Sequence, residues 1–153
     1  MPRLDNVRVE TWRSLQSLVG HLERTVDDEL RAEWDIALGW FDVMTSLQRL
    51  GGVARPLDIA SDLRLPASSI SRRLDRLEEE GWIARHRLVD QHDRRAVEIE
   101  LTKSGRRLWR EMNVSYRRAV QASFAVHMSD DDIDDIARIL AALAVDGSEH
   151  RAE

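Results

Sequence analysis

The stretch that decides the fold runs from Arg55 to Leu101 and reads RPLDIASDLRLPASSISRRLDRLEEEGWIARHRLVDQHDRRAVEIEL. Its first half carries two short helical patterns separated by a turn at Leu65-Pro66, and Gly81 ends the second helix. Its second half contains two strand-like runs, the second of which alternates apolar and polar residues, on either side of a charged loop. The order is therefore helix, turn, helix, strand, charged loop and strand.

This order predicts a winged helix-turn-helix. The second helix, expected over residues 67–80, places Ile70, Leu74 and Leu77 on one face at spacings of four and three, so this face packs inward. The opposite face offers serines short enough to sit deep in a major groove, and arginines that bind guanine edges or phosphates. These residues are Ser68, Ser69, Ser71, Arg72, Arg73 and Arg76. We interpret this segment as a DNA-reading helix; a solvated helix whose arginines pair with residues 78–80 is the alternative.

The two expected strands cover residues 82–88 and 96–101, and the loop between them reads VDQHDRR. Arg94 and Arg95 at the loop's tip suit a narrow minor groove, whose negative potential attracts arginine. Asp93 does not favour DNA by its charge, and we expect it to hold an arginine side chain through a carboxylate–guanidinium pair.

Length and composition indicate one compact domain of the mainly α class with a small β-wing. The chain has 153 residues, of which 42% are hydrophobic and 33% are charged, which suits a helical protein with long solvated faces. It has no cysteine, so disulfides, thiolate metal sites and cysteine-based peroxide sensing are excluded. No apolar run reaches the ~18 residues of a membrane span, and the N-terminus has no apolar signal core, so we expect a cytoplasmic protein without a membrane partner.

The charge is distributed unevenly, which matters for a nucleic-acid partner. The net charge is −5, yet the segment from Arg55 to Arg118 holds 15 Lys and Arg against 11 Asp and Glu. The rest of the chain holds 8 basic and 17 acidic residues. The local field, rather than the net charge, governs attraction to a phosphate backbone. The asymmetry therefore favours a basic DNA-binding module in an acidic body, with a chance fluctuation as the alternative.

Amphipathic helices are expected on both sides of this module. The helix before it, at about residues 9–30, has one apolar face, whereas that at about 34–50 is apolar over more than one face and should be the central core element. Thr102 caps a helix expected to reach about His127, and Ser129 opens the last helix, which ends near Gly147.

The first helix and the last two offer more apolar surface than the small winged module can cover. We therefore predict a homodimer, in which residues of about 4–30 and 106–147 form dimerisation helices and residues of about 53–104 form the winged helix-turn-helix lobe of one domain, 1–153. A bundle formed within one chain is the alternative. A dimer would set two reading helices about one turn of DNA, ~34 Å, apart on a palindromic operator.

Two segments resemble the MarR family of bacterial transcriptional regulators: DIASDLRLPASSISRRLDRLEEEGWI and DRRAVEIELTKSGRRL, the latter with an LT-x-x-G turn into the next helix. The resemblance implies a homodimeric regulator whose recognition helix begins near Ala67. It implies that Arg95 enters the minor groove, held by Asp93, and leaves Arg94 as the phosphate contact. It further implies repression that a small phenolic or otherwise anionic ligand releases.

The effector cavity expected from this resemblance lies between the first, second and fifth helices and the reading module. Trp12, Trp40 and Met44 are its candidate lining, and Arg13 is the candidate partner of an anionic ligand. The alternative is a core position, since aromatic and methionine residues at helical spacing more often lie in a core. The five histidines are scattered, with no pair three or four residues apart on a helix, so we expect no metal and no cofactor.

We therefore predict a sequence-specific DNA-binding transcriptional regulator, a repressor with a small aromatic or anionic effector. The alternative is a winged-helix module for protein–protein contact without specific DNA binding. An enzyme is not expected, because the sequence offers no nucleophile–base constellation and no phosphate-binding loop.

Overall fold

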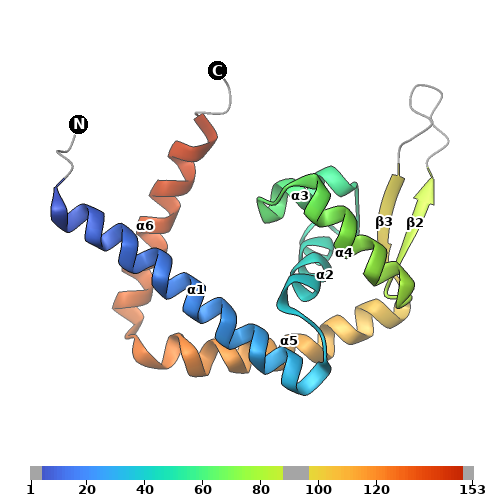
Figure 1. The fold of residues 1–153 in the computed structure, drawn as a ribbon, viewed down its shortest axis with the longest axis horizontal. Coiled ribbons are helices and arrows are strands. Elements are labelled where there is room, and N and C mark those ends of the chain that lie inside the picture. The colour runs from blue at the N-terminus through green and yellow to red at the C-terminus, as the bar shows by residue number, and fades with distance from the viewer. Residues whose placement is uncertain (1–4, 88–96, 150–153) are drawn as a thin grey trace.

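The computed structural model describes residues 5–87 and 97–149 and the side chains of 5–87 and 97–144. It is mainly helical, with one small antiparallel sheet, as predicted (Figure 1). The elements in chain order are α1 (Asn6–Trp34), α2 (Leu38–Arg49), β1 (Val53–Ala54), α3 (Pro56–Leu63), α4 (Ala67–Glu79), β2 (Ile83–Arg87), β3 (Val97–Leu101), α5 (Lys103–Ser123), the 3-10 turn η1 (Ala125–His127) and α6 (Asp130–Glu149).

The first two helices differ from the prediction at their shared boundary. Asp5 caps α1 by accepting a hydrogen bond from the Arg8 N–H at 3.0 Å, so the helix begins earlier than its apolar pattern. It also continues through Trp34, which the prediction had placed in the next helix. Asp35 then adopts a left-handed conformation with φ of 56°, and this residue ends α1.

Asp27, an acid in the C-terminal half of α1, serves the neighbouring helix. Asp27 Oδ1 accepts a hydrogen bond from the Leu38 N–H at 2.8 Å, at the first residue of α2. Its other carboxylate oxygen accepts from Arg31 Nε at 2.7 Å. Asp27 therefore acts as a remote cap for α2, where a negative charge is favourable.

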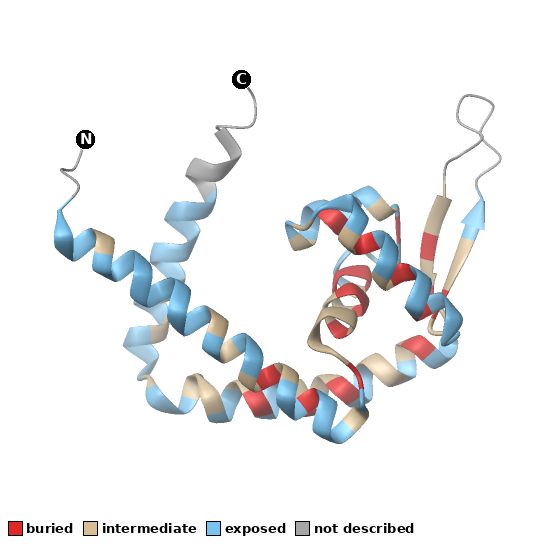
Figure 2. Cartoon of the chain, viewed as in Figure 1, coloured by how far each residue is buried: buried red, intermediate tan, exposed pale blue. Residues whose placement is uncertain are grey.

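The core is built around α2, as its apolar pattern predicted. Phe41, Val43, Met44 and Leu47 of α2 are buried, together with side chains from α3, α4, the sheet and α5 (Figure 2). The helices α3 and α4 pack on α2 and on each other. The core therefore sits beneath α4, whose other side faces solvent.

The sheet has the order β1-β3-β2, with both pairings antiparallel. The two longer strands confirm the predicted hairpin, whereas the two-residue β1 was not predicted, because two residues carry no periodic signal. The glycine of the LT-x-x-G turn, Gly105, is required by a close backbone contact. A Cβ there would lie 1.9 Å from the Trp82 carbonyl oxygen, so only glycine lets α5 begin this close to the hairpin.

The C-terminal helices extend away from the winged lobe. The helix predicted to reach His127 ends at Ser123 and continues as η1, after which α6 begins. α1 packs against α5, while α6 projects from the body (Figure 1) and has no comparable packing partner among the described residues. No described helix is both long and apolar enough to span a membrane.

Candidate nucleic-acid interface

The helix α4 presents a polar face above a buried one. Ile70, Leu74 and Leu77 are buried, with exposed fractions of 1% or less, and they hold α4 on the core. Ser68, Ser71 and Arg72 are exposed. The structure therefore brings these predicted residues together on the surface of the second helix of a helix-turn-helix, where a reading helix faces the major groove.

The N-terminus of α4 is open to an anion. Pro66 occupies the cap position, and in the described chain no side chain caps this helix. The N–H groups of Ala67 and Ser68 have no carbonyl to bond within the helix. Ser69, which is half-buried, donates its N–H to the Pro66 carbonyl at 3.0 Å. A DNA phosphate at this end would meet both free donors and the positive end of the helix dipole.

Arg76 lies on the flank of α4 that faces α2. Its Nη1 donates to Glu79 Oε2 at 2.9 Å, and its guanidinium carbon lies 5.9 Å from the ring centroid of Trp40. Trp40 in turn packs against Trp82, with ring centroids 6.3 Å apart. The Arg76 side chain is 59% exposed and is supported from below by Trp40, so it stays available to a phosphate.

Arg73 is placed differently from the other predicted DNA-contact residues. It lies half-buried on the edge of α4, and its Nη1 donates to the carbonyl oxygen of Gly39, at the start of α2, at 3.1 Å. A Cβ on Gly39 would lie 2.9 Å from the Arg73 guanidinium carbon, so the glycine makes room for it. The structure thus directs Arg73 toward α2 rather than outward with Arg72. The predicted wing-tip residues Asp93, Arg94 and Arg95 lie outside the described residues.

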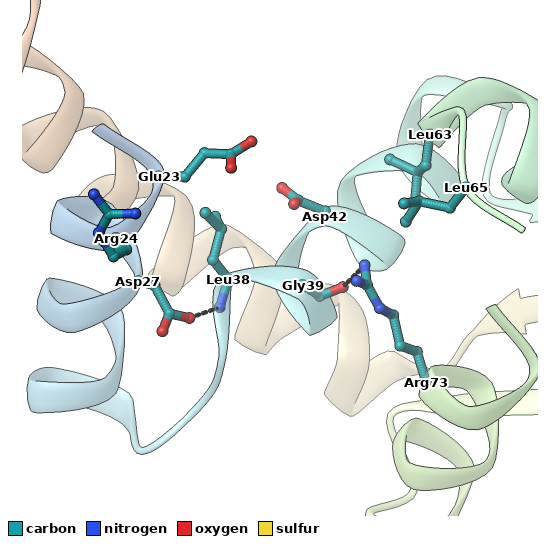
Figure 3. A pocket seen from close by; sticks show the side chains of 9 residues that line it. All are labelled: Glu23, Arg24, Asp27, Leu38, Gly39, Asp42, Leu63, Leu65 and Arg73. Carbon is teal, nitrogen blue, oxygen red and sulfur yellow. Dashed lines mark hydrogen bonds between the residues drawn. The ribbon is translucent and has the colours of Figure 1, made fainter. Parts of the chain in front are cut away.

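A hollow of about 430 Å³ lies between α1, α2 and the helix-turn-helix, and Arg73 forms part of its wall (Figure 3). Glu23 and Asp42 direct their carboxylates into it from opposite sides. Its lining residues are Glu23, Arg24, Asp27, Leu38, Gly39, Asp42, Leu63, Leu65 and Arg73. Because α1, α2 and α4 all contribute walls, a molecule bound here would contact both the helical body and the reading helix.

Asp42 has the most perturbed acidity in this hollow. Burial, helped by the charge of the nearby Glu23, raises the pKa of Asp42 to about 6 against the opposing charge of Arg73. A carboxyl group that changes charge near neutral pH, in a hollow, is a common property of binding sites. Asp42 was not among the predicted site residues, although an acid in the apolar run of α2 was a visible signal.

A second, mainly apolar hollow of about 180 Å³ lies next to the first and shares Glu23 and Leu38 with it. Its remaining lining residues are Leu22, Val26, Tyr116, Val120, Ser123 and Phe124, from α1, α5 and the residue after α5. The effector cavity was predicted between the first, second and fifth helices and the reading module. This hollow is lined by those three helices, whereas residues of the helix-turn-helix line the first hollow.

The four predicted effector residues do not meet in either hollow. Met44 is fully buried in the core, and Trp40 packs against Trp82 and Arg76. Trp12 is 59% exposed on α1, where Arg13 donates to Glu10 at 2.8 Å. Periodicity identified apolar faces correctly, but it could not tell which apolar residues face the core and which face a cavity.

The arrangement offers no metal centre within residues 5–87 and 97–149. No group of three or more His, Cys, Asp or Glu side chains is placed there to hold a metal ion. The described residues present two features suited to recognition, which are the exposed Ser/Arg face of α4 and a charged hollow joined to an apolar one.

Comparisons with known proteins agree with this geometry. The sequence model of the MarR family matches residues 38–97, which run from the start of α2 to the start of β3. The transcriptional regulator PecS of Dickeya dadantii is 34% identical over 80 residues, which are 51% of this chain and 47% of PecS. The chain thus matches about half the length of this curated relative.

Solved structures share the fold over almost the whole chain. Sco3205, a MarR family transcriptional regulator from Streptomyces coelicolor solved in complex with DNA, has a TM-score of 0.83 at 20% identity, covering 94% of this chain and 90% of its own. The organohalide-sensing regulator RdhR, solved with 2,4-dichlorophenol bound, has a TM-score of 0.79 at 18% identity, covering 94% and 84%. At these identities the likeness is one of fold.

Proposed function

We propose that the chain belongs to the MarR family of transcriptional regulators, whose model matches residues 38–97, and that it is a homodimeric DNA-binding repressor that a small ligand releases from its operator. The observation that carries the proposal is the exposed face of α4, where Ser68, Ser71 and Arg72 stand above a fully buried apolar face. This is the arrangement of a helix that enters the major groove.

DNA contact is divided between the reading helix and the wing. Arg72 reaches base edges or phosphates, Arg76 reaches a phosphate beside its Trp40 support, and the N-terminus of α4 receives another phosphate. Arg95 enters the minor groove and Arg94 binds the backbone, with Asp93 holding the wing arginine in place. Sco3205, which shares the fold, was solved in complex with DNA, and this supports DNA binding by the present chain.

The dimer is formed by α1 and α6. Large apolar side chains on these two helices are exposed in the single chain, where covering them would remove unfavourable contact with water. They are Val7, Trp12, Leu15, Leu18 and Val19 on α1, and Ile139, Leu140 and Leu143 on α6. A second copy is the simplest cover, and the two-fold symmetry would place two α4 helices on a palindromic site.

The effector binds in the charged hollow and its apolar neighbour. A ligand that reaches Arg73 competes with the Gly39 carbonyl for the guanidinium and so changes how α4 rests on α2. A ligand shifts the protein toward the DNA-free state only as far as it binds that state more tightly. The solved structure of RdhR with a bound chlorophenol supports an aromatic ligand, and Arg24 and Arg73 suit an anionic group on it.

The deciding experiment is a salt titration of duplex binding by fluorescence anisotropy. The wild-type chain should bind duplex DNA, with affinity that falls steeply from about 50 to 200 mM salt as counterions are released. Arg72→Ala and Arg95→Ala should each weaken binding about tenfold or more, since one good arginine contact contributes about 1–3 kcal/mol.

Arg107→Ala is the matched control, because Arg107 is an exposed arginine on α5 that pairs with Glu111. It should bind DNA as the wild type does. If the wild-type chain binds no duplex in a salt-dependent manner, the chain is instead a winged-helix module for protein contact.

As a DNA-binding regulator the protein acts in the cytoplasm, which fractionation of cells would test.

A further inference from the structure

Arg85 of β2 lies against the acidic flank of α4. Its Nη2 donates to Asp75 Oδ1 at 2.6 Å, and its Nη1 donates to Glu78 Oε2 at 2.5 Å. The two acids are three residues apart, so they point to the same side of α4. One guanidinium therefore bridges two carboxylates of the reading helix from the neighbouring sheet.

The burial of the three groups shows which of them faces outward. The Arg85 side chain is 29% exposed, whereas those of Asp75 and Glu78 are 56% and 41% exposed. Arg85 is also held by its strand, in which it pairs with Ile99 of β3. The guanidinium of Arg85 is therefore less exposed to solvent than the two carboxylates. Both of its terminal nitrogens already donate hydrogen bonds to them, so Arg85 is poorly placed to contact DNA itself.

The positions of Asp75 and Glu78 on α4 make their charges important for the approach of DNA. Asp75 lies one helical turn after Arg72, an exposed arginine of α4. Two uncompensated negative charges at this position would repel the phosphates of a duplex that α4 approaches, and they would also repel each other along the helix. A fixed positive charge from β2 cancels this repulsion without entering the groove.

We propose that Arg85 supports DNA binding indirectly, by neutralising the carboxylates of Asp75 and Glu78 on the reading helix. The inference rests on the proposed DNA-binding function, and it adds a residue outside the reading helix on which that function depends. Exposed ion pairs contribute little to folding stability, so the main effect of Arg85 falls on DNA affinity.

The test compares three variants by duplex anisotropy, using a labelled duplex of mixed sequence at about 50 and 200 mM salt. Arg85→Gln should fold as the wild type does and bind about tenfold more weakly at the lower salt, with a smaller loss at the higher salt because ions screen the exposed carboxylates. The triple variant Asp75→Asn, Glu78→Gln, Arg85→Gln should recover wild-type affinity to within about twofold, because no unpaired charge remains.

The recovery separates charge neutralisation from other roles. If Arg85 contacted DNA or only fixed the helix angle, the triple variant would bind as weakly as Arg85→Gln, and that result would overturn the proposal. The double variant Asp75→Asn, Glu78→Gln keeps Arg85 and should bind at least as tightly as the wild type; weaker binding would also contradict the proposal. This double variant provides the test even if Arg85→Gln fails to fold.

Arg107→Gln is the matched control, since it breaks a similar exposed pair, Arg107–Glu111 at 3.0 Å, on α5. Its affinity should stay unchanged. A wild-type chain that binds no duplex would overturn the proposed function and this inference with it. Wild-type binding with unchanged affinity in Arg85→Gln would overturn the inference alone.

Discussion

Gly105 of α5 approaches the carbonyl group of Trp82 so closely that a Cβ atom would lie 1.9 Å from the oxygen and 2.8 Å from the carbon. The obstacle is backbone, so a larger residue cannot be accommodated by a side-chain rotation. This contact fixes the start of α5 against the end of α4 and the first strand of the wing, and it joins the helical body to the winged helix-turn-helix lobe.

Gly105→Ala should therefore destabilise the fold. We expect a loss of about 1–3 kcal/mol in the free energy of unfolding, measured by urea denaturation, because an added methyl in a packed site forces the backbone to move. Gly20→Ala is the control. Its Cβ would meet only the end of the Arg24 side chain at 3.4 Å, and alanine in a helix interior should stabilise by about 0.5–1 kcal/mol. A Gly105→Ala variant with an unchanged free energy of unfolding would contradict the close contact.

Asp27→Ala should weaken the junction of α1 and α2. The substitution removes the carboxylate that caps the Leu38 N–H and pairs with Arg31. Loss of a helix cap costs about 1 kcal/mol, and urea denaturation would measure it. Glu10→Ala breaks an exposed pair with Arg13 that caps nothing, and its effect should be near zero. Equal effects of the two variants would show that Asp27 acts only as a surface charge.

Asp42→Asn should stabilise the protein at neutral pH. The pKa of Asp42 is raised from 3.8 to about 6 by burial, so the folded state holds a proton that the unfolded state has lost between these values. The contribution of Asp42 to the free energy of unfolding of the wild type is therefore largest at acidic pH, and it falls as pH rises through about 4 to 6.

The difference in the free energy of unfolding between Asp42→Asn and the wild type should therefore grow over this pH range. It should level off above the range, at up to about 3 kcal/mol. Urea denaturation at several pH values would measure the difference. Asp28→Asn, at an exposed position on α1, should show no such growth. A difference that shrinks with rising pH would mean that Arg73, rather than burial, dominates the acidity of Asp42.

Leu143→Asp should dissociate the proposed dimer. Leu143 of α6 is 60% exposed in the single chain, and a charge placed in an apolar interface opposes association. Light scattering coupled to size exclusion should give the mass of one chain instead of two, and duplex affinity should fall because the two reading helices are no longer joined. Leu57→Asp, at an exposed leucine of α3, should remain a dimer. A dimeric Leu143→Asp would exclude this part of α6 from the interface.

The helix-turn-helix and hairpin could be predicted because their signals are local. Apolar spacing placed Ile70, Leu74 and Leu77 on the buried face of α4, and Pro66 and Gly81 marked its two ends. The same periodicity identified α2 as the core helix. Where local signals were weaker, the boundaries moved: Trp34 joined α1 rather than α2, since only the left-handed Asp35 ends that helix.

The sequence by itself determined the order of elements and the exposed polar face of α4, and it indicated the family resemblance, because these depend on the types and spacing of nearby residues. The tertiary structure alone decided what distant charged groups do. It directed Arg73 to the Gly39 carbonyl, set Asp27 at the start of α2 and placed Arg85 across Asp75 and Glu78. These pairs join residues 7 to 34 positions apart, and only packing brings such residues within hydrogen-bonding distance. The hollow beside Asp42 has the same origin, since its walls come from separate helices that meet only in the folded chain.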